Sequence, residues 1–237
     1  MDEFKHIKAV GFEVEGMWTK ERVFTEEDGI YNIGFRSDGS VSGLVGNSEL
    51  QWQGEFATRP ITKAEQVENE LEIAWPERWN NTCGFHIHIS TKSMESYSRL
   101  MDKPFYNIFK REIEQSLIGS LKDEETRKIF QRRIDGESTY CHTGWRAEQQ
   151  AIATDKGSIR YHHLNFCWNL HGTMEVRVPP MMTLEDGKTT TNYITTLVET
   201  YLQKRKKIVS FKTEIETDSM TILPTNTKFE TTIKNEI

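Results

Sequence analysis

Hydrophobic and acidic residues alternate near the start of the chain. At the two-residue period of a β-strand, such a segment has one apolar face and one acidic face. The apolar face carries Val10, Phe12 and Val14, and the acidic face carries Glu13 and Glu15. Two carboxylates on one face repel each other, and a hard cation between them relieves the repulsion. The plainer interpretation is a solvated strand with an acidic outer face, so the rest of the chain must decide between the two.

Three later segments repeat this design. Their polar faces carry Glu55 with Gln53 in residues 49–58, His86 with His88 in residues 83–90, and Glu175 with Arg177 in residues 173–178. An antiparallel sheet with helices on one face and an open opposite face would bring these side chains together. The pattern therefore predicts an α+β fold whose open face holds the functional residues.

Helical periodicity separates these strands. We expect helices over residues 62–75, 93–134 and 190–208, the first opened by a capping box of Thr62 and Glu65 and the second interrupted near Asp102 and Pro104. Residues 160–170 alternate as a further strand, and residues 135–158 form a long loop. We expect one catalytic domain over residues 1–210 and a loosely attached tail over residues 211–237.

Composition narrows the class of protein. The chain has 237 residues, 36% hydrophobic and 28% charged, which is ordinary for a globular protein. Its net charge of −6 argues against a general nucleic-acid or membrane-surface binder. Three widely spaced cysteines, with no C-x-x-C pair, indicate reduced thiols, and the first residues contain no apolar signal segment. We therefore expect a cytoplasmic protein. The oligomeric state is not predicted.

Carboxylates and imidazole on one face predict a divalent-cation site, and a neighbouring arginine indicates an anionic substrate. Two other interpretations of His86 and His88 stay open. One is a zinc or iron site of the cupin kind on a β-sandwich, although the glutamate that this pattern needs after the second histidine is not in place. The other is a pair of hydrogen-bonded histidines on a half-exposed strand. Neither a nucleophile elbow nor a phosphate-binding glycine motif occurs in the sequence.

Four motifs, in order, resemble those of the amidoligase family, which comprises carboxylate–amine ligases related to glutamine synthetase and glutamate–cysteine ligase. The motifs are Gly11-Phe12-Glu13-Val14-Glu15, Gly54-Glu55-Phe56-Ala57-Thr58-Arg59-Pro60, Cys83-Gly84-Phe85-His86-Ile87-His88 and Thr173-Met174-Glu175-Val176-Arg177. The resemblance covers about residues 7 to 205, with one extra residue before Pro60 relative to the usual pattern.

The resemblance implies a glutamine-synthetase-like fold and an ATP- and magnesium-dependent ligase that works through an acyl-phosphate. It implies Mg²⁺ (or Mn²⁺) ligands at Glu13, Glu15, Glu55, His86 and Glu175, with Glu55 also catalytic. It further places His88 and Asn165 beside the nucleotide, and Arg177 and Arg160 on the phosphoryl group or the substrate carboxylate. The substrates would be a small-molecule or peptide carboxylate and an amine. A family member retained for binding after losing activity is the non-enzymatic alternative.

Overall fold

The computed structural model describes residues 3–23, 34–38, 41, 51–138, 141–144, 161–204, 211–212 and 230–231. The chain divides into two compact units, Met1–Gln203 and Lys204–Ile237. The described part of the second unit is one antiparallel pair, β7 (Phe211–Lys212) with β8 (Glu230–Thr231). All candidate site residues belong to the first unit.

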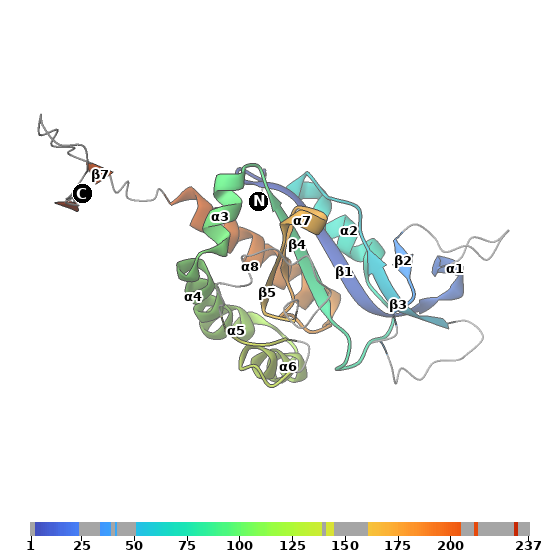
Figure 1. Cartoon of the computed structure of the whole chain (residues 1–237). Helices are drawn as coiled ribbons and strands as arrows, with labels where there is room; N and C mark the ends of the chain where they lie inside the picture. Colours follow the sequence, from blue (N-terminus) through green and yellow to red (C-terminus); the bar gives the residue numbers. More distant parts are fainter. Residues whose placement is uncertain are drawn as a thin grey trace, which may run out of the picture. The chain divides into compact units, whose positions relative to one another are not determined.

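The first unit contains a six-stranded sheet in the order β2-β3-β1-β4-β6-β5, and every neighbouring pair is antiparallel. The strands are β1 (Ile7–Thr19), β2 (Phe35–Arg36), β3 (Gln51–Ala57), β4 (Phe85–Thr91), β5 (Leu164–Cys167) and β6 (Thr173–Val176). The long strand β1 lies near the middle, between β3 and β4 (Figure 1). The α+β class and the antiparallel sheet predicted from the alternation are therefore confirmed.

The helices of the described residues are α1 (Lys20–Val23), η1 (Ala64–Gln66), α2 (Val67–Ala74), α3 (Met94–Met101), α4 (Lys103–Glu112), η2 (Ile113–Leu117), α5 (Ile118–Ser120), α6 (Glu124–Ile134), α7 (Trp168–His171) and α8 (Leu184–Gln203). Of these, α2, η2 and α8 place buried side chains against the apolar face of this sheet. None of the helices in the described ranges combines the length and the apolar character needed to cross a membrane.

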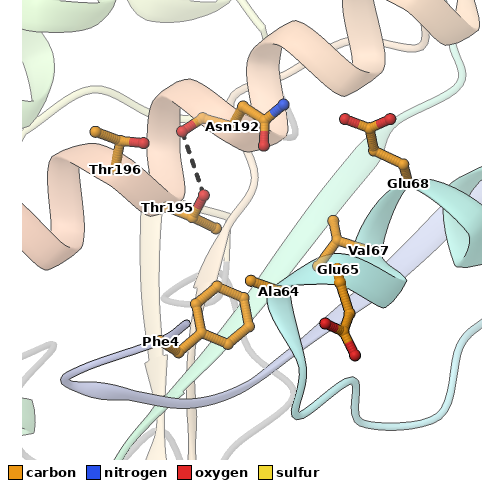
Figure 2. Close-up of a pocket in the computed structure, with 8 residues that line it drawn as sticks. All are labelled: Phe4, Ala64, Glu65, Val67, Glu68, Asn192, Thr195 and Thr196. Carbon is orange, nitrogen blue, oxygen red and sulfur yellow. Dashed lines mark hydrogen bonds between the residues drawn. The ribbon is translucent and has the colours of Figure 1, made fainter. Parts of the chain in front are cut away.

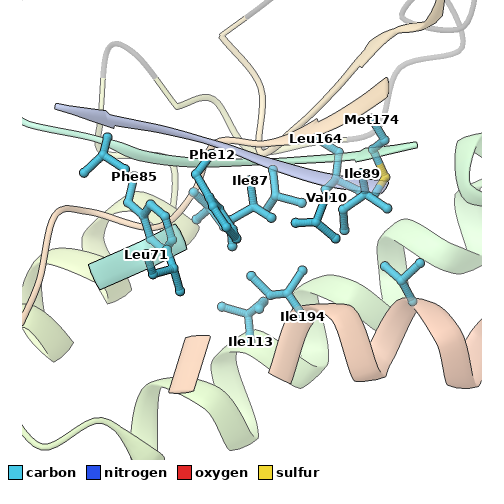
Figure 3. Packing of buried hydrophobic residues seen from close by; sticks show 14 of the residues in the cluster. Val10, Phe12, Leu71, Phe85, Ile87, Ile89, Ile113, Leu164, Met174 and Ile194 are labelled. Atoms are coloured by element: carbon cyan, nitrogen blue, oxygen red, sulfur yellow. The ribbon is translucent and has the colours of Figure 1, made fainter. Parts of the chain in front are cut away.

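The core lies between the sheet and these helices. Figure 3 shows Phe12, Ile87 and Ile89 extending from the sheet toward Ile113 of η2 and Ile194 of α8. These side chains are almost fully buried, and burying each one stabilises the fold by roughly 1.5–3 kcal/mol. Because the apolar parity of each strand is used here, the opposite parity of the same strands must face away from the core.

The helix predicted over residues 62–75 begins later and without its capping box. Lys63 is the N-cap of the 3₁₀ turn η1 and makes no side-chain cap hydrogen bond. Ile61 explains the delay, because it exchanges backbone hydrogen bonds with Val10 of 2.9 and 2.7 Å and so holds the preceding chain extended. The capping-box prediction was therefore wrong.

Two other boundaries differ. Of the strand predicted over residues 160–170, the described residues 161–170 form only β5, because Cys167 pairs with Thr173 and the five residues between them must reverse the chain. This turn ends at Gly172, whose φ of 67° is a conformation that favours glycine. Helix α8 begins at Leu184 instead of residue 190, where the hydroxyl of Thr183 accepts a hydrogen bond from the backbone N–H of Asp186 at 3.2 Å.

Candidate functional site

The strand register brings the predicted polar residues onto one face of the sheet. Glu15 lies directly opposite Glu55 on β3, and Glu13 lies opposite His86 on β4. His88 is paired in turn with Glu175 on β6, which is paired with Asn165 on β5. Directly paired residues in adjacent strands share a face, so the set forms a continuous polar band across all six strands when Arg36, opposite Glu55 on β2, is included.

Within this band, one group of three possible metal ligands comprises Glu13, His88 and Glu175. One ligand atom from each lies within 4.8 Å of the others. This span fits ligands around one cation, since atoms on opposite sides of a magnesium ion are about 4.2 Å apart. We call these three residues the first ligand group.

The charges of the first ligand group are strongly coupled. Burial opposes ionisation of Glu13, but hydrogen bonds from His86 and His88 hold its pKa well below the usual range. Burial also disfavours a charged imidazole, yet Cys167 and the carboxylates of Glu13 and Glu175 raise the pKa of His88 to about 10. An imidazolium must lose its proton before its nitrogen can coordinate a metal, so metal binding here is expected to release a proton.

Glu175 is the most tightly held carboxylate of the band. Asn165 Nδ2 donates to its Oε2 at 2.7 Å, and Arg177 Nη1 donates to its Oε1. Burial would raise the pKa of Glu175, but the charge of Arg177 and the nearby histidines lower it. Glu175 is therefore a fixed, ionised carboxylate in the protein interior.

A second ligand group comprises Glu15, Asp38 and Glu55, whose ligand atoms also lie within 4.8 Å of one another. Glu15 is 7% exposed, and its Oε2 accepts a 2.6 Å hydrogen bond from the backbone N–H of Gly84. Arg36 Nη1 lies 3.7 Å from Glu55 Oε1. Glu13 and Glu15 are two residues apart on β1, so the first and second ligand groups are neighbours on the same face.

Carboxylate repulsion is visible in the second ligand group. Burial, followed by the charges of Glu13, Glu15 and Asp38, raises the pKa of Glu55 to about 8 against a partial opposing effect of Arg36. Burial also raises the pKa of Glu15. A cluster of buried carboxylates with raised pKa values is costly for the fold and is typical of functional sites.

His86, which the resemblance implies as a metal ligand, lies beside the carboxylates of the first ligand group. Its Nδ1 lies 3.4 Å from Glu13 Oε2 and 3.3 Å from Glu175 Oε1, so it bridges two carboxylates of the first ligand group. His88, expected near the nucleotide, supplies the imidazole nitrogen that lies within 4.8 Å of the ligand atoms of Glu13 and Glu175. Its buried Nε2 lies 3.4 Å from Glu13 Oε1.

The residues expected to contact the nucleotide or the substrate differ in their surroundings. Asn165 is 8% exposed, and its amide is directed at Glu175, so it orients a carboxylate instead of facing open space. Arg177 lies beside Glu175 and over the ring of Tyr161, 5.7 Å from the ring centroid. Its buried Nε has no hydrogen-bond partner in the described part of the chain. Arg160 lies outside the described residues.

The donor set fits a hard divalent cation. Across the two ligand groups, five carboxylates and one imidazole are available, and neither group includes a cysteine. Oxygen-rich sets of this kind suit Mg²⁺ or Mn²⁺, whereas zinc favours histidine and cysteine. The β-sandwich of the cupin alternative is not formed by the described residues, whose larger sheet is a single six-stranded layer.

Two contributors are not among the residues predicted from the sequence. Asp38 joins the second ligand group with its carboxylate. Arg133 of α6 donates to the carbonyl groups of Cys83 and Pro179 beside the site. Their separation in sequence from β1 leaves no local signal for either contact.

A cavity of about 280 Å³ lies elsewhere, where Phe4 and η1 face α8 (Figure 2). Its lining includes Glu65 and Thr195, and the Thr195 hydroxyl donates to the carbonyl of Asn192 at 3.2 Å. None of the residues of the two ligand groups lines it. The candidate site is therefore the polar face of the sheet and not this cavity.

Comparison of the chain with protein-family models, with curated proteins and with solved structures gave no match. The resemblance to the amidoligases therefore stays a prediction that depends on the four motifs.

Proposed function

We propose that this protein is an ATP- and Mg²⁺-dependent carboxylate–amine ligase. The observation that carries the proposal is the pair of adjacent ligand groups, Glu13/His88/Glu175 and Glu15/Asp38/Glu55, on one face of an antiparallel sheet. Two neighbouring cations held by carboxylates are a recurring arrangement for phosphoryl transfer. The four sequence motifs, which lie on these same strands, favour acyl-phosphate formation over other phosphoryl transfers.

The chemistry of such a ligase is mostly positioning and charge neutralisation. Bound magnesium ions would neutralise the phosphate oxygens of ATP. The side chains of Glu13, His88 and Glu175 would hold one ion, and those of Glu15, Asp38 and Glu55 the other.

Arg177 is the cationic group best placed to act on the substrates. It is 12% exposed in its side chain and paired with Glu175, and its Nε is not used by another described residue. A guanidinium offers several fixed donors, so one edge can pair with Glu175 while another contacts a phosphoryl or carboxylate oxygen. In this role Arg177 would stabilise negative charge during transfer of the γ-phosphoryl group to the carboxylate.

The experiment has a binding arm and a chemical arm. In the binding arm, ATP should raise the melting temperature only when Mg²⁺ or Mn²⁺ is present. Glu15→Gln should remove this effect, because it replaces a charged ligand by a neutral one of the same shape. Glu68→Gln, which changes an exposed carboxylate on α2, is the matched control and should behave like the wild type.

In the chemical arm, a panel of carboxylic acids is supplied with ATP, Mg²⁺ and hydroxylamine. An acyl-phosphate mechanism yields a hydroxamate together with equal amounts of ADP and phosphate. Amide formation that proceeds unchanged without ATP would contradict the ligase proposal. Tight stoichiometric zinc with no effect of nucleotide would instead favour the histidine-based alternative.

A further inference from the structure

Arg133 is connected to the second ligand group through a single peptide unit. Its Nη2 donates to the carbonyl of Cys83 at 3.0 Å. The N–H at the other end of that same peptide belongs to Gly84, and it donates to Glu15 Oε2 at 2.6 Å. A guanidinium, a peptide group and a carboxylate are thus hydrogen-bonded in series.

The planarity of the peptide makes this series mechanically stiff. A trans peptide holds its C=O and N–H in one plane and directs them to opposite sides, so a rotation that weakens one bond also weakens the other. Hydrogen bonds in such a chain polarise one another, and a cation at one end with an anion at the other strengthens both. The orientation of the Glu15 carboxylate therefore depends on how the Cys83–Gly84 peptide is held.

Arg133 shares the Cys83 carbonyl with the N–H of Met181, which donates at 3.1 Å, and also contacts a neighbouring segment of the chain. Its Nη1 donates to the carbonyl of Pro179 at 2.9 Å, and this carbonyl also accepts from the N–H of Phe85 at 3.2 Å. The guanidinium consequently links the chain just before β4 to the chain just after β6. A lysine has one ammonium group and cannot reproduce the two-pronged contact at the same geometry.

A side chain at position 84 would not fit beside His86 and Glu15. A Cβ at this position would lie 2.7 Å from His86 Nε2 and 3.4 Å from Glu15 Oε2. The backbone of Gly84 also accepts a hydrogen bond from the Glu15 N–H at 3.1 Å. Gly84 therefore bonds Glu15 twice: its N–H donates to the Glu15 carboxylate, and its C=O accepts from the Glu15 N–H.

We propose that Arg133 is a positioning residue of the site, which fixes the Cys83–Gly84 peptide so that Glu15 directs its carboxylate toward Asp38 and Glu55. The inference rests on the proposed function only in assigning a divalent cation to the second ligand group. Arg133 reaches Glu15 through the peptide, and, against the larger effect of burial, its charge also lowers the pKa of the Glu15 carboxyl.

The test compares Arg133→Lys and Arg133→Gln with Arg127→Lys. Arg127 lies on the same helix, is also half-buried, and donates to one backbone carbonyl, that of Leu121, at 2.8 Å. Arg127→Lys therefore reproduces the loss of a helix-anchoring hydrogen bond without touching the Cys83–Gly84 peptide. Two quantities are measured for each protein, the amide resonance of Gly84 without metal and the dissociation constant for Mn²⁺.

Both Arg133 variants should shift the Gly84 amide resonance upfield, because its hydrogen bond to Glu15 lengthens. They should also weaken Mn²⁺ binding by about ten-fold, the lower end of the loss found when groups that orient metal ligands are removed. Arg127→Lys should leave the Gly84 resonance in place and the Mn²⁺ affinity within about two-fold of the wild type. Equal effects of Arg127→Lys and Arg133→Lys on both quantities would overturn the inference.

The two readouts separate this inference from the proposed function. A shifted Gly84 resonance in a protein that binds no Mn²⁺ would refute the metal site while supporting the peptide linkage. Normal Mn²⁺ binding by Arg133→Lys, with an unmoved Gly84 resonance, would refute the linkage and leave the metal site standing. If neither Arg133 variant folds, the Arg133 side-chain resonances are compared between wild type and Glu15→Gln, and an unchanged position overturns the inference.

Discussion

Replacing Glu55 by glutamine should stabilise the metal-free protein. The Glu55 carboxylate is buried among Glu13, Glu15 and Asp38, which raises its pKa to about 8 from an ordinary value of 4.5. The folded state therefore binds this proton more tightly than the unfolded state does. Its contribution to stability is present below about pH 4.5 and is lost as the pH rises toward 8.

The size of the effect follows from the two pKa values. At pH 7 the unfolded state has released the proton and the folded state has not, which costs the wild type about 3 kcal/mol relative to a side chain that cannot ionise. Glutamine is such a side chain, with nearly the same shape. For a folded unit of this size, about 3 kcal/mol corresponds to a gain of roughly 6–12 °C in melting temperature.

The assay is urea unfolding in the presence of EDTA between pH 4 and pH 8. The stability difference between Glu55→Gln and wild type should be close to zero at pH 4 and grow with pH. Adding Mg²⁺ and ATP should stabilise the wild type and leave Glu55→Gln almost unchanged, because the variant lacks a ligand. Glu68→Gln is the control for a carboxylate outside the cluster. A variant that is less stable than wild type at pH 7 without metal would refute the reasoning.

Three further predictions concern single groups and metal choice. Arg177→Lys should lower kcat at least about ten-fold while leaving the dissociation constant for Mg·ATP nearly unchanged, because lysine lacks the planar guanidinium that contacts the developing charge. Equal losses in kcat and in Mg·ATP affinity would place Arg177 in nucleotide binding instead. His163 is buried, with a pKa lowered to about 4 by burial, so its contribution to stability is present above pH 6.5 and falls by about 2 kcal/mol at pH 5. Urea unfolding should show a smaller acid-induced loss for His163→Gln than for wild type, and parallel losses would contradict this. Mn²⁺ should replace Mg²⁺ in the ATP-dependent thermal shift and Zn²⁺ should not; a shift with Zn²⁺ alone would contradict the oxygen-rich assignment.

The sheet could be predicted because its signal is local. Alternation over a few residues fixes which side chains share a face, so Glu13, Glu15 and Glu175 were assigned to one surface without any knowledge of strand order. Alternation alone does not distinguish His86 from His88, and their assignment as a metal ligand and a nucleotide contact depends on the family resemblance. They share a parity, and each lies 3.4 Å from a carboxylate oxygen of Glu13.

The contributors that sequence missed depend on contacts between distant segments. Asp38 reaches the site because β2 pairs with β3, and Arg133 reaches it because α6 packs near the chain that precedes β4. Asn165 was expected beside the nucleotide, and the direction of its amide toward Glu175 follows from the register of β5 and β6. The boundary errors have a similar origin, since the backbone pairing of Ile61 with Val10 delays the first helix.

The most direct test of the account is the location of bound metal. Crystals grown with Mn²⁺ and a non-hydrolysable ATP analogue would be measured at the manganese absorption edge. The account predicts two anomalous peaks, one among Glu13, His88 and Glu175 and one beside Glu15 and Glu55, with the nucleotide phosphates between them and Arg177 on the same face. Nucleotide bound elsewhere, with no manganese peak at either ligand group, would contradict it.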